Sequence, residues 1–292
     1  MNHCPWCGTP SQHRYLKLND YFLSQEEFEI FECDQCHLLY TVPRPLPEKI
    51  GVYYQSENYY SHQENKTGFI PRLYEWVKSI NIKRKVRLAT VGLTPGSVLD
   101  IGCGVGDFLF AMKEKSWKIV GIEPSDAARD IAQNRLGIPL LRPEDSAQLP
   151  DHSFDLITLW HVLEHVDDLK HQITEFQRLL KPNGRLLLAL PNYKSYDAQH
   201  YKQYWAAWDV PRHLNHFCPD SIHSIFDSTS IELVDIQKLV WDSYYISYLS
   251  EGYMKHSLPL VRGFFVGLWS NLHALQSGMY SSLVYRFKSP KS

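Results

Sequence analysis

The sequence predicts an α/β protein with a doubly wound parallel sheet, and three observations lead to this fold class. A short apolar run at Val98–Ile101 is typical of a buried strand. A turn with three glycines follows it directly, and helical spacing of apolar residues begins after Asp107. A second strand, Trp117–Glu123, then ends in a carboxylate. This order of elements is that of a nucleotide-binding half of a doubly wound sheet.

The glycine turn has the properties of a ligand-binding loop. Its glycines are Gly102, Gly104 and Gly106. Glycine adopts positive φ angles and lets backbone N–H groups approach a ligand that a Cβ would exclude. The helix that follows offers unpaired N–H groups and a favourable dipole to an anionic ligand group. Glu123 stands about where doubly wound folds place the acid that binds ribose hydroxyls, which predicts an adenosine ligand.

The spacing of the glycines distinguishes a dinucleotide from other adenosine-containing ligands. The dinucleotide fingerprint is G-x-G-x-x-G, whereas this turn reads Gly-Cys-Gly-Val-Gly, with Asp100 just ahead of it. Three further segments follow in order, at 145–150, 153–166 and 179–191. Together these segments resemble the motifs of class I S-adenosyl-L-methionine (SAM)-dependent methyltransferases, over roughly residues 92–192. The resemblance implies a Rossmann-like methyltransferase sheet and SAM as methyl donor.

The resemblance also implies which residues bind SAM. The three glycines shape the methionine pocket, Glu123 holds the ribose, Asp145 accepts from the adenine amino group and the Ser146 backbone contacts the ring. For Asp145 an ordinary Asx turn is the alternative. The expected cofactor-binding residues are Asp100, Gly102, Cys103, Gly104, Gly106, Glu123, Asp145, Ser146 and His161.

The sequence predicts a brief third strand at Leu140–Leu141 and a fourth at Phe154–Leu159. Titratable residues after this fourth strand form the expected chemical centre. His161, Glu164 and His165 have i, i+3, i+4 spacing, so a helix beginning near Trp160 would place all three on one face. We expect His165 to remove the acceptor's proton and Glu164 to orient or tune its imidazole. In the alternative, the histidines only pack against SAM, because positioning alone can suffice.

A metal at this centre is a further possibility. The Glu-His pair resembles metal-dependent methyltransferases in which a Glu-x-x-Glu-His helix binds magnesium. Here His161 replaces the first glutamate. Because hard cations prefer oxygen ligands, this replacement argues against magnesium and leaves zinc or iron open.

A segment at about 191–220 reads as an insertion that covers the acceptor. Similar insertions occur in methyltransferases that pair a zinc ribbon with this core, including enzymes that C-methylate nucleotide-linked sugars. The expected substrate residues are Tyr60, Trp208 and Arg212, with His213 as a second base. The alternative for Arg212 is a structural ion pair with Asp209. The short region after Phe287 departs from the sugar enzymes and puts a sugar nucleotide in doubt.

Two CxxC pairs at the N-terminus predict a zinc ribbon. Their cysteines are Cys4, Cys7, Cys33 and Cys36, and the apolar residues at 15–18 and 28–31 between the pairs predict two short strands. Four thiolates complete the tetrahedral shell of a structural Zn²⁺, and the metal would supply much of the folding free energy of so small a segment. Two disulfides are the alternative. The expected organisation is a zinc ribbon at 1–42, a linker and cover helix at 43–90, and a methyltransferase domain at 91–292 that includes a C-terminal lid region.

Composition sets broader limits. The hydrophobic content of 44% suffices for a packed core, and the net charge of −2 gives no general attraction to nucleic acid or an anionic membrane. Without a signal peptide or an uninterrupted apolar window of about 20 residues, a cytoplasmic location and no membrane span are expected. For the apolar segment Leu258–Trp269 we expect a buried or lid helix rather than an interfacial anchor.

These inferences converge on an enzyme that transfers a methyl group from SAM to oxygen or carbon of a small-molecule acceptor. The acceptor would be a sugar, a quinone-like compound or a lipid-linked compound. Two alternatives stay open. One is an RNA-modifying methyltransferase that uses the ribbon and the basic helix at 70–90, and the other is a non-catalytic SAM-binding protein.

Overall fold

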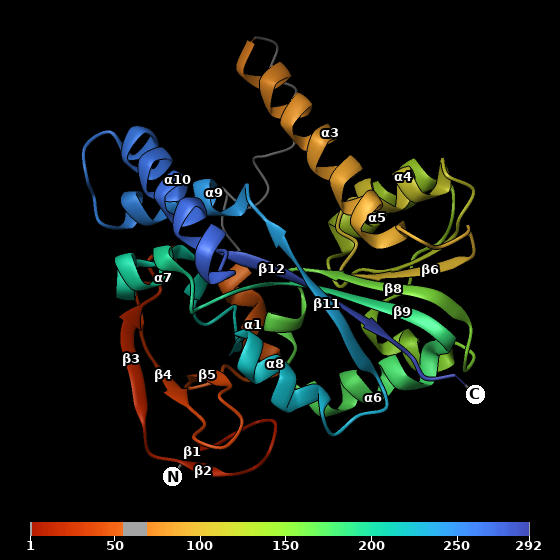
Figure 1. Ribbon diagram of the computed structural model, residues 1–292, viewed down its shortest axis with the longest axis horizontal. Helices are drawn as coiled ribbons and strands as arrows, with labels where there is room; N and C mark the ends of the chain where they lie inside the picture. Colours follow the sequence, from red (N-terminus) through yellow and green to blue (C-terminus); the bar gives the residue numbers. More distant parts are fainter. Residues whose placement is uncertain (1, 55–68, 292) are drawn as a thin grey trace. The chain divides into compact units, whose positions relative to one another are not determined.

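The computed structural model describes residues 2–54 and 69–291 and divides into two compact units (Figure 1). We call the first the ribbon unit; it consists of Met1–Tyr60, Leu163–Gln172 and Ala189–Tyr285. The second, the core unit, consists of Ser61–Val162, Ile173–Leu188 and Arg286–Ser292. Each unit is therefore assembled from segments that are far apart in the sequence.

The core unit contains the parallel strands that the sequence predicts. Its elements include α3 (Phe69–Thr90), β6 (Ser97–Ile101), α4 (Asp107–Lys113), β7 (Lys118–Ile122), α5 (Asp126–Leu136), a 3₁₀ helix at Pro143–Gln148, β8 (Phe154–Trp160) and most of β9 (Leu180–Pro191). These strands are ordered β9-β8-β6-β7, and β6 pairs in parallel with both β7 and β8. The predicted α/β fold class is confirmed. The predicted third strand at Leu140–Leu141 is reduced to a single bridge between Leu141 and Ile122.

Hydrophobic burial holds the core strands together. Val98 and Leu99 of β6 and Leu156 and Ile157 of β8 are fully buried. Consecutive residues of a strand point to opposite faces, so both faces of this part of the sheet are covered, as parallel sheets require. The carboxyl ends of β6, β7 and β8 lie along one edge, and the turns that follow these strands meet there.

The ribbon unit is built around a small antiparallel sheet. Its strand order is β10-β5-β4-β3, formed by β3 (Arg14–Asn19), β4 (Glu27–Glu32), β5 (Leu39–Val42) and β10 (Asn215–His216), beside the two-residue pair β1 (Asn2–His3) and β2 (Pro10–Ser11). The sequence predicts β3 and β4. It does not predict β10, in which Asn215 pairs with Tyr40 and so joins the insertion to the ribbon sheet.

Further short helices and two strands complete the ribbon unit. They are α1 (Pro47–Ile50), 3₁₀ helices at Gly51–Tyr54, Leu163–His165, Lys202–Tyr204 and Ala206–Trp208, α7 (Tyr196–Tyr201), α8 (Pro219–Phe226), β11 (Glu232–Leu239), α9 (Asp242–Tyr253), α10 (Pro259–Ser277) and most of β12 (Ser282–Lys288). The helix α6 (Leu169–Leu179) belongs partly to each unit.

The ribbon shares its hydrophobic core with the insertion. Leu18, Phe28 and Ile30 of the ribbon strands form one buried cluster with Trp205 and Trp208. A segment of about 40 residues has too little apolar surface for an independent core, and this packing supplies the rest. The domain boundaries that the sequence predicts, after residue 42 for the zinc ribbon and after residue 90 for the linker and cover helix, stay predictions.

The C-terminal helix α10 differs from expectation. Its large apolar side chains are exposed and its small residues are buried, so the prediction of a buried helix over Leu258–Trp269 is wrong, whereas the alternative of a lid helix stays a prediction. None of the described helices combines the length and apolarity that crossing a membrane requires.

Candidate functional site

The glycine turn of the core unit has the backbone geometry that its sequence predicts. Gly102, Gly104 and Gly106 have φ angles of 69°, 55° and 79°, in the left-handed region. A Cβ on Gly102 would lie 2.4 Å from Val162, so close packing alone requires glycine there. A Cβ on Gly104 would meet nothing within 4 Å. Gly104 therefore borders open space, where a ligand can approach the backbone.

Glu123 links this turn to the next helix. Its carboxylate accepts hydrogen bonds from the backbone N–H groups of Gly104 and Ser125, both at 2.8 Å. Glu123 directly follows β7 and is buried. These backbone donors fix the acid at the carboxyl edge of the parallel sheet, and its role at ribose stays a prediction.

The acid that precedes the turn is enclosed by protein. Asp100 is buried in β6 and its Oδ1 accepts a hydrogen bond from Thr158 at 2.6 Å. Burial raises the pKa of Asp100 to about 7. This hydrogen bond joins β6 to β8, and direct contact of Asp100 with SAM stays a prediction.

Asp145 and Ser146 lie in the 3₁₀ helix at Pro143–Gln148. Asp145 accepts a hydrogen bond from the backbone of Arg142 at 3.0 Å, and the Ser146 carbonyl accepts one from Arg178 at 3.1 Å. Both residues are partly exposed. The adenine contacts predicted for Asp145 and Ser146 stay predictions.

Cys103, in the glycine turn, is buried, and burial raises the pKa of its thiol.

The chain after β8 does not form the helix that the sequence predicts. Trp160 is the last residue of β8, His161 has a left-handed φ of 61°, and only a 3₁₀ turn follows at Leu163–His165. The prediction of one α-helical face for His161, Glu164 and His165 is therefore wrong. His161 directly follows the last residue of β8 and belongs to the core unit. Its role at the cofactor stays a prediction.

Within the ribbon unit, Glu164 and His165 lie beside His213 of the insertion. The rings of His165 and His213 are 4.6 Å apart and nearly perpendicular. The backbone of Leu214 donates to the Glu164 carbonyl at 2.8 Å, which holds the two segments together. Glu164 is almost completely buried. The structure thus brings together all three predicted catalytic residues.

Hydrogen bonds to backbone carbonyls fix the tautomers of the two histidines. His165 Nδ1 lies 3.0 Å from the Arg212 carbonyl, and His213 Nδ1 lies 2.8 Å from the Ala207 carbonyl. Because a carbonyl only accepts, each Nδ1 carries the hydrogen, and in the neutral imidazole Nε2 keeps its lone pair. The Tyr54 oxygen also lies 3.0 Å from His165 Nδ1.

Burial, together with the neighbouring His213, lowers the pKa of His165 to about 4. His165 is thus neutral near pH 7, with a lone pair that can accept a proton or bind a metal. One ligand atom each from Glu164, His165 and His213 lies within 4.8 Å of the others. This two-histidine, one-carboxylate set suits zinc or iron better than magnesium, but its second histidine is His213 and not the His161 of the sequence-based argument.

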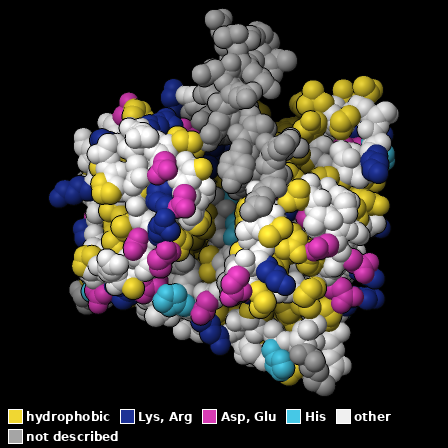
Figure 2. Space-filling view, turned by 180° about the vertical axis from the view of Figure 1, so that it is seen from behind, with side chains coloured by type: hydrophobic (Ala, Val, Ile, Leu, Met, Phe, Trp, Pro, Cys, Tyr) yellow, Lys and Arg dark blue, Asp and Glu magenta, His cyan; other side chains and the backbone are white. Residues whose placement is uncertain are grey.

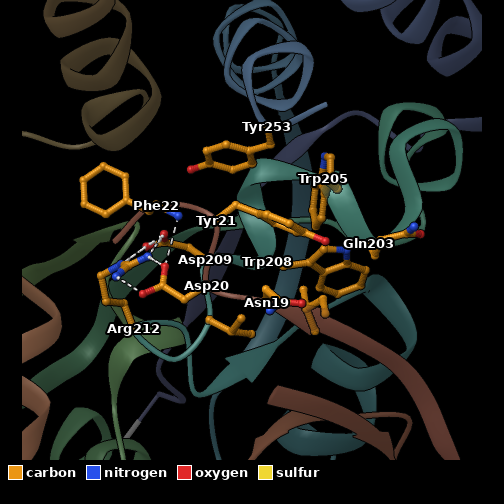
Figure 3. A pocket seen from close by; sticks show the side chains of 12 residues that line it. Asn19, Asp20, Tyr21, Phe22, Gln203, Trp205, Trp208, Asp209, Arg212 and Tyr253 are labelled. Carbon is orange, nitrogen blue, oxygen red and sulfur yellow. Dashed lines mark hydrogen bonds and ion pairs between the residues drawn. The ribbon is translucent and has the colours of Figure 1, made fainter. Parts of the chain in front are cut away.

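Arg212 lies in a buried ionic network (Figure 3). Its guanidinium donates to Asp209 through Nε and Nη2 at 2.8–3.1 Å, to Asp20 Oδ1 at 2.8 Å and to the Tyr53 carbonyl at 3.0 Å. The side chains of Arg212 and Asp20 are 2% and 0% exposed. The structural pairing with Asp209 considered as an alternative is present. Binding of a substrate anion by Arg212 stays a prediction.

Asp20 is expected to stabilise the ribbon unit strongly. Burial raises the pKa of Asp20, but hydrogen bonds from Arg212 and Ser24 outweigh it and hold the pKa below its usual range. This contribution is therefore present at neutral pH and lost as the pH falls through the acid range. Asp20→Asn leaves the buried guanidinium partly uncompensated, so we expect the free energy of unfolding to drop by about 3 kcal/mol.

Denaturant unfolding measures this effect against a matched exposed pair. Arg14 and Glu29 form an ion pair at 2.8 Å whose side chains are 56% and 33% exposed. Glu29→Gln is expected to change stability by less than about 1 kcal/mol. Equal losses for the two variants would show that the buried network is not the stronger one.

The other two predicted substrate residues have different outcomes. Trp208 is buried, donates through Nε1 to the Lys202 carbonyl at 2.7 Å, and packs edge-on against Trp205 and His216. It lines a pocket of only about 10 Å³, so stacking on a substrate would require it to be uncovered. Tyr60 lies outside the described residues.

The four N-terminal cysteines converge as two matching turns. The backbone of Gly8 donates to the Cys4 carbonyl, and the backbone of His37 donates to the Cys33 carbonyl, both at 2.9 Å. Gly8 and His37 also share a left-handed φ. Sγ–Sγ separations of 3.6 Å (Cys4–Cys36) and 3.4 Å (Cys7–Cys33) leave all four thiols free, contrary to the disulfide alternative. Four sulfurs about 2.3 Å from a tetrahedral zinc would be about 3.8 Å apart, so this set fits the ion.

Sequence reasoning missed three groups at the histidine pair and at the neighbouring Arg212. Tyr54 and the predicted substrate residue Tyr60 belong to one tyrosine-rich stretch, residues 53–60, in which nothing in the sequence distinguishes the two. Asp20 lies in an ordinary polar turn between two strands. The carbonyls that fix the imidazoles carry no sequence signal, because every residue has one.

Comparisons with known proteins agree with this geometry. The family model described as a methyltransferase domain matches residues 74–235, more than half of the chain. A demethylmenaquinone methyltransferase from Thermotoga maritima is 33% identical over 133 residues, which cover 43% of this chain and 58% of that protein. A ubiquinone biosynthesis O-methyltransferase from Idiomarina loihiensis is 26% identical over 167 residues, covering 52% and 68%.

Among solved structures, phosphoethanolamine N-methyltransferase 2 from Haemonchus contortus in complex with SAM has a TM-score of 0.55 at 15% identity. The match covers 87% of this chain and 63% of that one, and it concerns the fold. Family match, glycine turn and sheet topology lead to one conclusion: the chain belongs to the class I SAM-dependent methyltransferases.

Proposed function

We propose that this chain methylates oxygen or carbon of a small molecule whose hydroxyl or C–H group is acidic, such as a phenolic, quinol-like compound. One observation carries the proposal: two imidazoles beside Glu164, that of His213 buried and that of His165 half-buried, have their Nδ1 atoms bound to carbonyls, which leaves Nε2 as acceptor. The names of the relatives from Thermotoga and Idiomarina, which refer to menaquinone and ubiquinone, support a quinone-related acceptor.

The core unit would bind the donor. SAM supplies an electrophilic methyl group on a sulfonium leaving group. Gly104 leaves room for the ligand at the turn, Glu123 binds the ribose hydroxyls, and Asp145 accepts from the adenine amino group. Cys103, Ser146 and His161 line the same edge. These groups act by binding and orientation, which is the main requirement for transfer from so good a donor.

His165 would take the proton from the acceptor. With a pKa of about 4 it is a weak base, so it removes protons more readily from an acidic hydroxyl than from an alcohol. A phenol, whose pKa is about 10 like that of tyrosine, fits better than a sugar hydroxyl. Glu164 stabilises the imidazolium that forms, and His213 is positioned as a second acceptor.

We further propose that Cys4, Cys7, Cys33 and Cys36 hold a structural Zn²⁺. The closed four-thiolate set leaves no position for a substrate, which is typical of structural rather than catalytic zinc. The ion would fix the two cysteine turns from which the ribbon sheet begins. The ribbon in turn carries Asp20, whose contact with Arg212 helps to set the carbonyl that binds His165.

The pH dependence of kcat follows from the lowered pKa of His165. Because His165 is neutral above about pH 5, we expect its titration to leave kcat unchanged between about pH 6 and 8 and to lower it only as the pH falls through about 4. A pH profile of kcat with saturating substrates tests this. An inflection near pH 6.5 that disappears in a His165 variant would contradict it.

Mass spectrometry of reaction mixtures tests the function itself. Purified protein is incubated with SAM and, separately, with quinol precursors, free and nucleotide-linked sugars, and RNA. We expect the methyl mass to appear on a phenolic compound, and to require His165. Methylation of RNA with steep salt dependence would favour the RNA alternative. SAM binding without any methylated product would favour a non-catalytic role.

A further inference from the structure

The helical hairpin of α9 and α10 exposes an unusually apolar surface. Leu260 and Phe265 are 71% and 61% exposed, more than most hydrophobic residues of the chain. The other exposed large side chains of this surface are Trp241, Tyr245, Tyr248, Leu258, Val261, Phe264, Trp269, Leu272 and Leu275. Figure 2 shows hydrophobic side chains gathered on one side of the molecule, at upper right. Single exposed apolar residues are normal, but a continuous group marks a binding surface.

The packing inside the hairpin is the reverse of that in a water-soluble helix pair. The buried positions of α10 are Gly263, Gly267, Ser270 and Ala274. A Cβ on Gly263 would lie 2.6 Å from the backbone of Tyr248, and one on Gly267 would lie 2.9 Å from the Cα of Tyr244. The two backbones are thus in close contact through small residues spaced four apart.

This arrangement is that of helices packed in lipid. In water the hydrophobic effect places Leu, Phe and Trp between helices, whereas in a bilayer the lipid tails solvate these side chains and small residues form the contact. Apart from Ile246 of α9, which is buried, the hairpin buries mainly glycine and serine and directs most of its large side chains outward. An open groove of about 360 Å³, lined by Tyr196, Phe265 and Trp269 among others, adds apolar surface at α10.

The charges at the hairpin favour a lipid headgroup region. Lys255 and Arg262 flank the exposed Leu258 and Leu260. The acidic residues of α9 and α10 are Asp242, at the first position of α9, and Glu251, whose side chain is 1% exposed and bonded to Arg262 and His256 at 2.7 Å. The apolar end is therefore bordered by basic groups, which complement phosphate.

We propose that the α9–α10 hairpin docks on a phospholipid bilayer, with its apolar side chains in the boundary between headgroups and acyl chains. Tryptophan and tyrosine prefer this boundary because their rings are apolar and their tips are polar. The hairpin lies in one leaflet, since none of the described helices is long and apolar enough to cross. If the hairpin instead paired with a second copy of this chain, basic residues beside the apolar surface would serve no purpose, so these residues favour a bilayer over a dimer.

Vesicle co-sedimentation of the full chain tests the proposal. The vesicles contain phosphatidylcholine alone or mixed with phosphatidylglycerol. We expect the wild type to bind both, and the double variant Leu260→Ser, Phe265→Ser to partition at least about 100-fold more weakly. Val234→Ser, at a residue of β11 that is 60% exposed, is the matched control and is expected to bind like the wild type. Lys255→Gln is expected to lose about fivefold, on the anionic vesicles only.

Two further measurements complete the test. Near-ultraviolet circular dichroism and thermal unfolding of each variant report whether the ribbon unit, which contains the hairpin, remains folded, so weaker vesicle binding can be separated from unfolding. Sedimentation velocity without lipid measures self-association. A wild type that ignores both vesicle types, or a dimer that the double variant converts to a monomer without any lipid binding, would overturn the proposal.

Discussion

Replacing His165 with glutamine is expected to lower kcat by about 10²–10⁴-fold, the usual contribution of a positioned general base. Glutamine keeps a polar side chain of similar size, but it has no lone pair that accepts a proton near neutral pH. Its amide can still donate to the Arg212 carbonyl, so the local backbone should be retained. We expect KM for the acceptor and Kd for SAM to change much less than kcat.

The exposed His223 of α8 provides the control for this substitution. His223→Gln is expected to leave kcat unchanged. Steady-state kinetics with the acceptor identified by mass spectrometry, combined with SAM titration of both variants, separates catalysis from binding. If His165→Gln retained wild-type kcat, proton removal by His165 would be excluded and positioning alone would explain the reaction.

Loss of the Zn²⁺ proposed for the four N-terminal cysteines is expected to have the largest effect on stability. Binding energies of about 10–16 kcal/mol are typical of four-ligand structural zinc sites, and they act as folding energy. Cys33→Ser removes one ligand of a closed set, so we expect at least about 5 kcal/mol less stability and substoichiometric zinc. Because Asp20 and Tyr54 lie on the same ribbon unit, catalytic activity should fall together with its folding.

Elemental analysis and thermal unfolding, with and without a strong chelator, measure this effect. The matched control is Cys218→Ser, at a buried free cysteine far from the four in sequence, whose Sγ contacts the Tyr193 hydroxyl at 3.0 Å. Its cost is expected to be about 1–3 kcal/mol and independent of chelator. A purified wild type without zinc, which unfolds identically with and without chelator, would contradict the metal assignment.

The parts of the fold that repeat a local pattern could be predicted from the sequence. The strand, glycine turn and helix at Ser97–Lys113 follow from apolar periodicity and from glycine's conformational freedom, both of which are local. The same is true of β3 and β4. The strand β10 has only two residues and pairs with β5 across a long separation in sequence, so no periodic signal marks it.

The helix expected near Trp160 failed for a related reason. The i, i+3, i+4 spacing describes a helix only if the backbone is helical, and His161 instead adopts a left-handed φ that few non-glycine residues take. For α10, apolar content was correctly recognised, but which face is buried depends on the partner. Gly263 and Gly267 decided that, through their contact with α9.

In the candidate site, too, the identities of residues could be predicted from the sequence, whereas properties that depend on tertiary packing could not. The identities of Glu164, His165 and His213 could be proposed from chemistry, and the structure places them together in the ribbon unit. The tautomers and the lowered pKa of His165 depend on burial and on carbonyls from distant segments. The network of Arg212 with Asp20 depends on tertiary packing as well, since the two residues are far apart in sequence.

Calorimetric titration with SAM and with its demethylated product tests the central assignment most directly. We expect both to bind the wild type at one site, and Gly104→Ala to weaken SAM by at least about tenfold, because its Cβ enters the open space at the turn. Gly137→Ala is the control: its φ is 67°, a Cβ there also meets nothing within 4 Å, and it should pay the same roughly 1 kcal/mol of backbone strain without changing SAM affinity. No heat with either ligand, or equal affinities for the two variants, would contradict binding of SAM at the glycine turn.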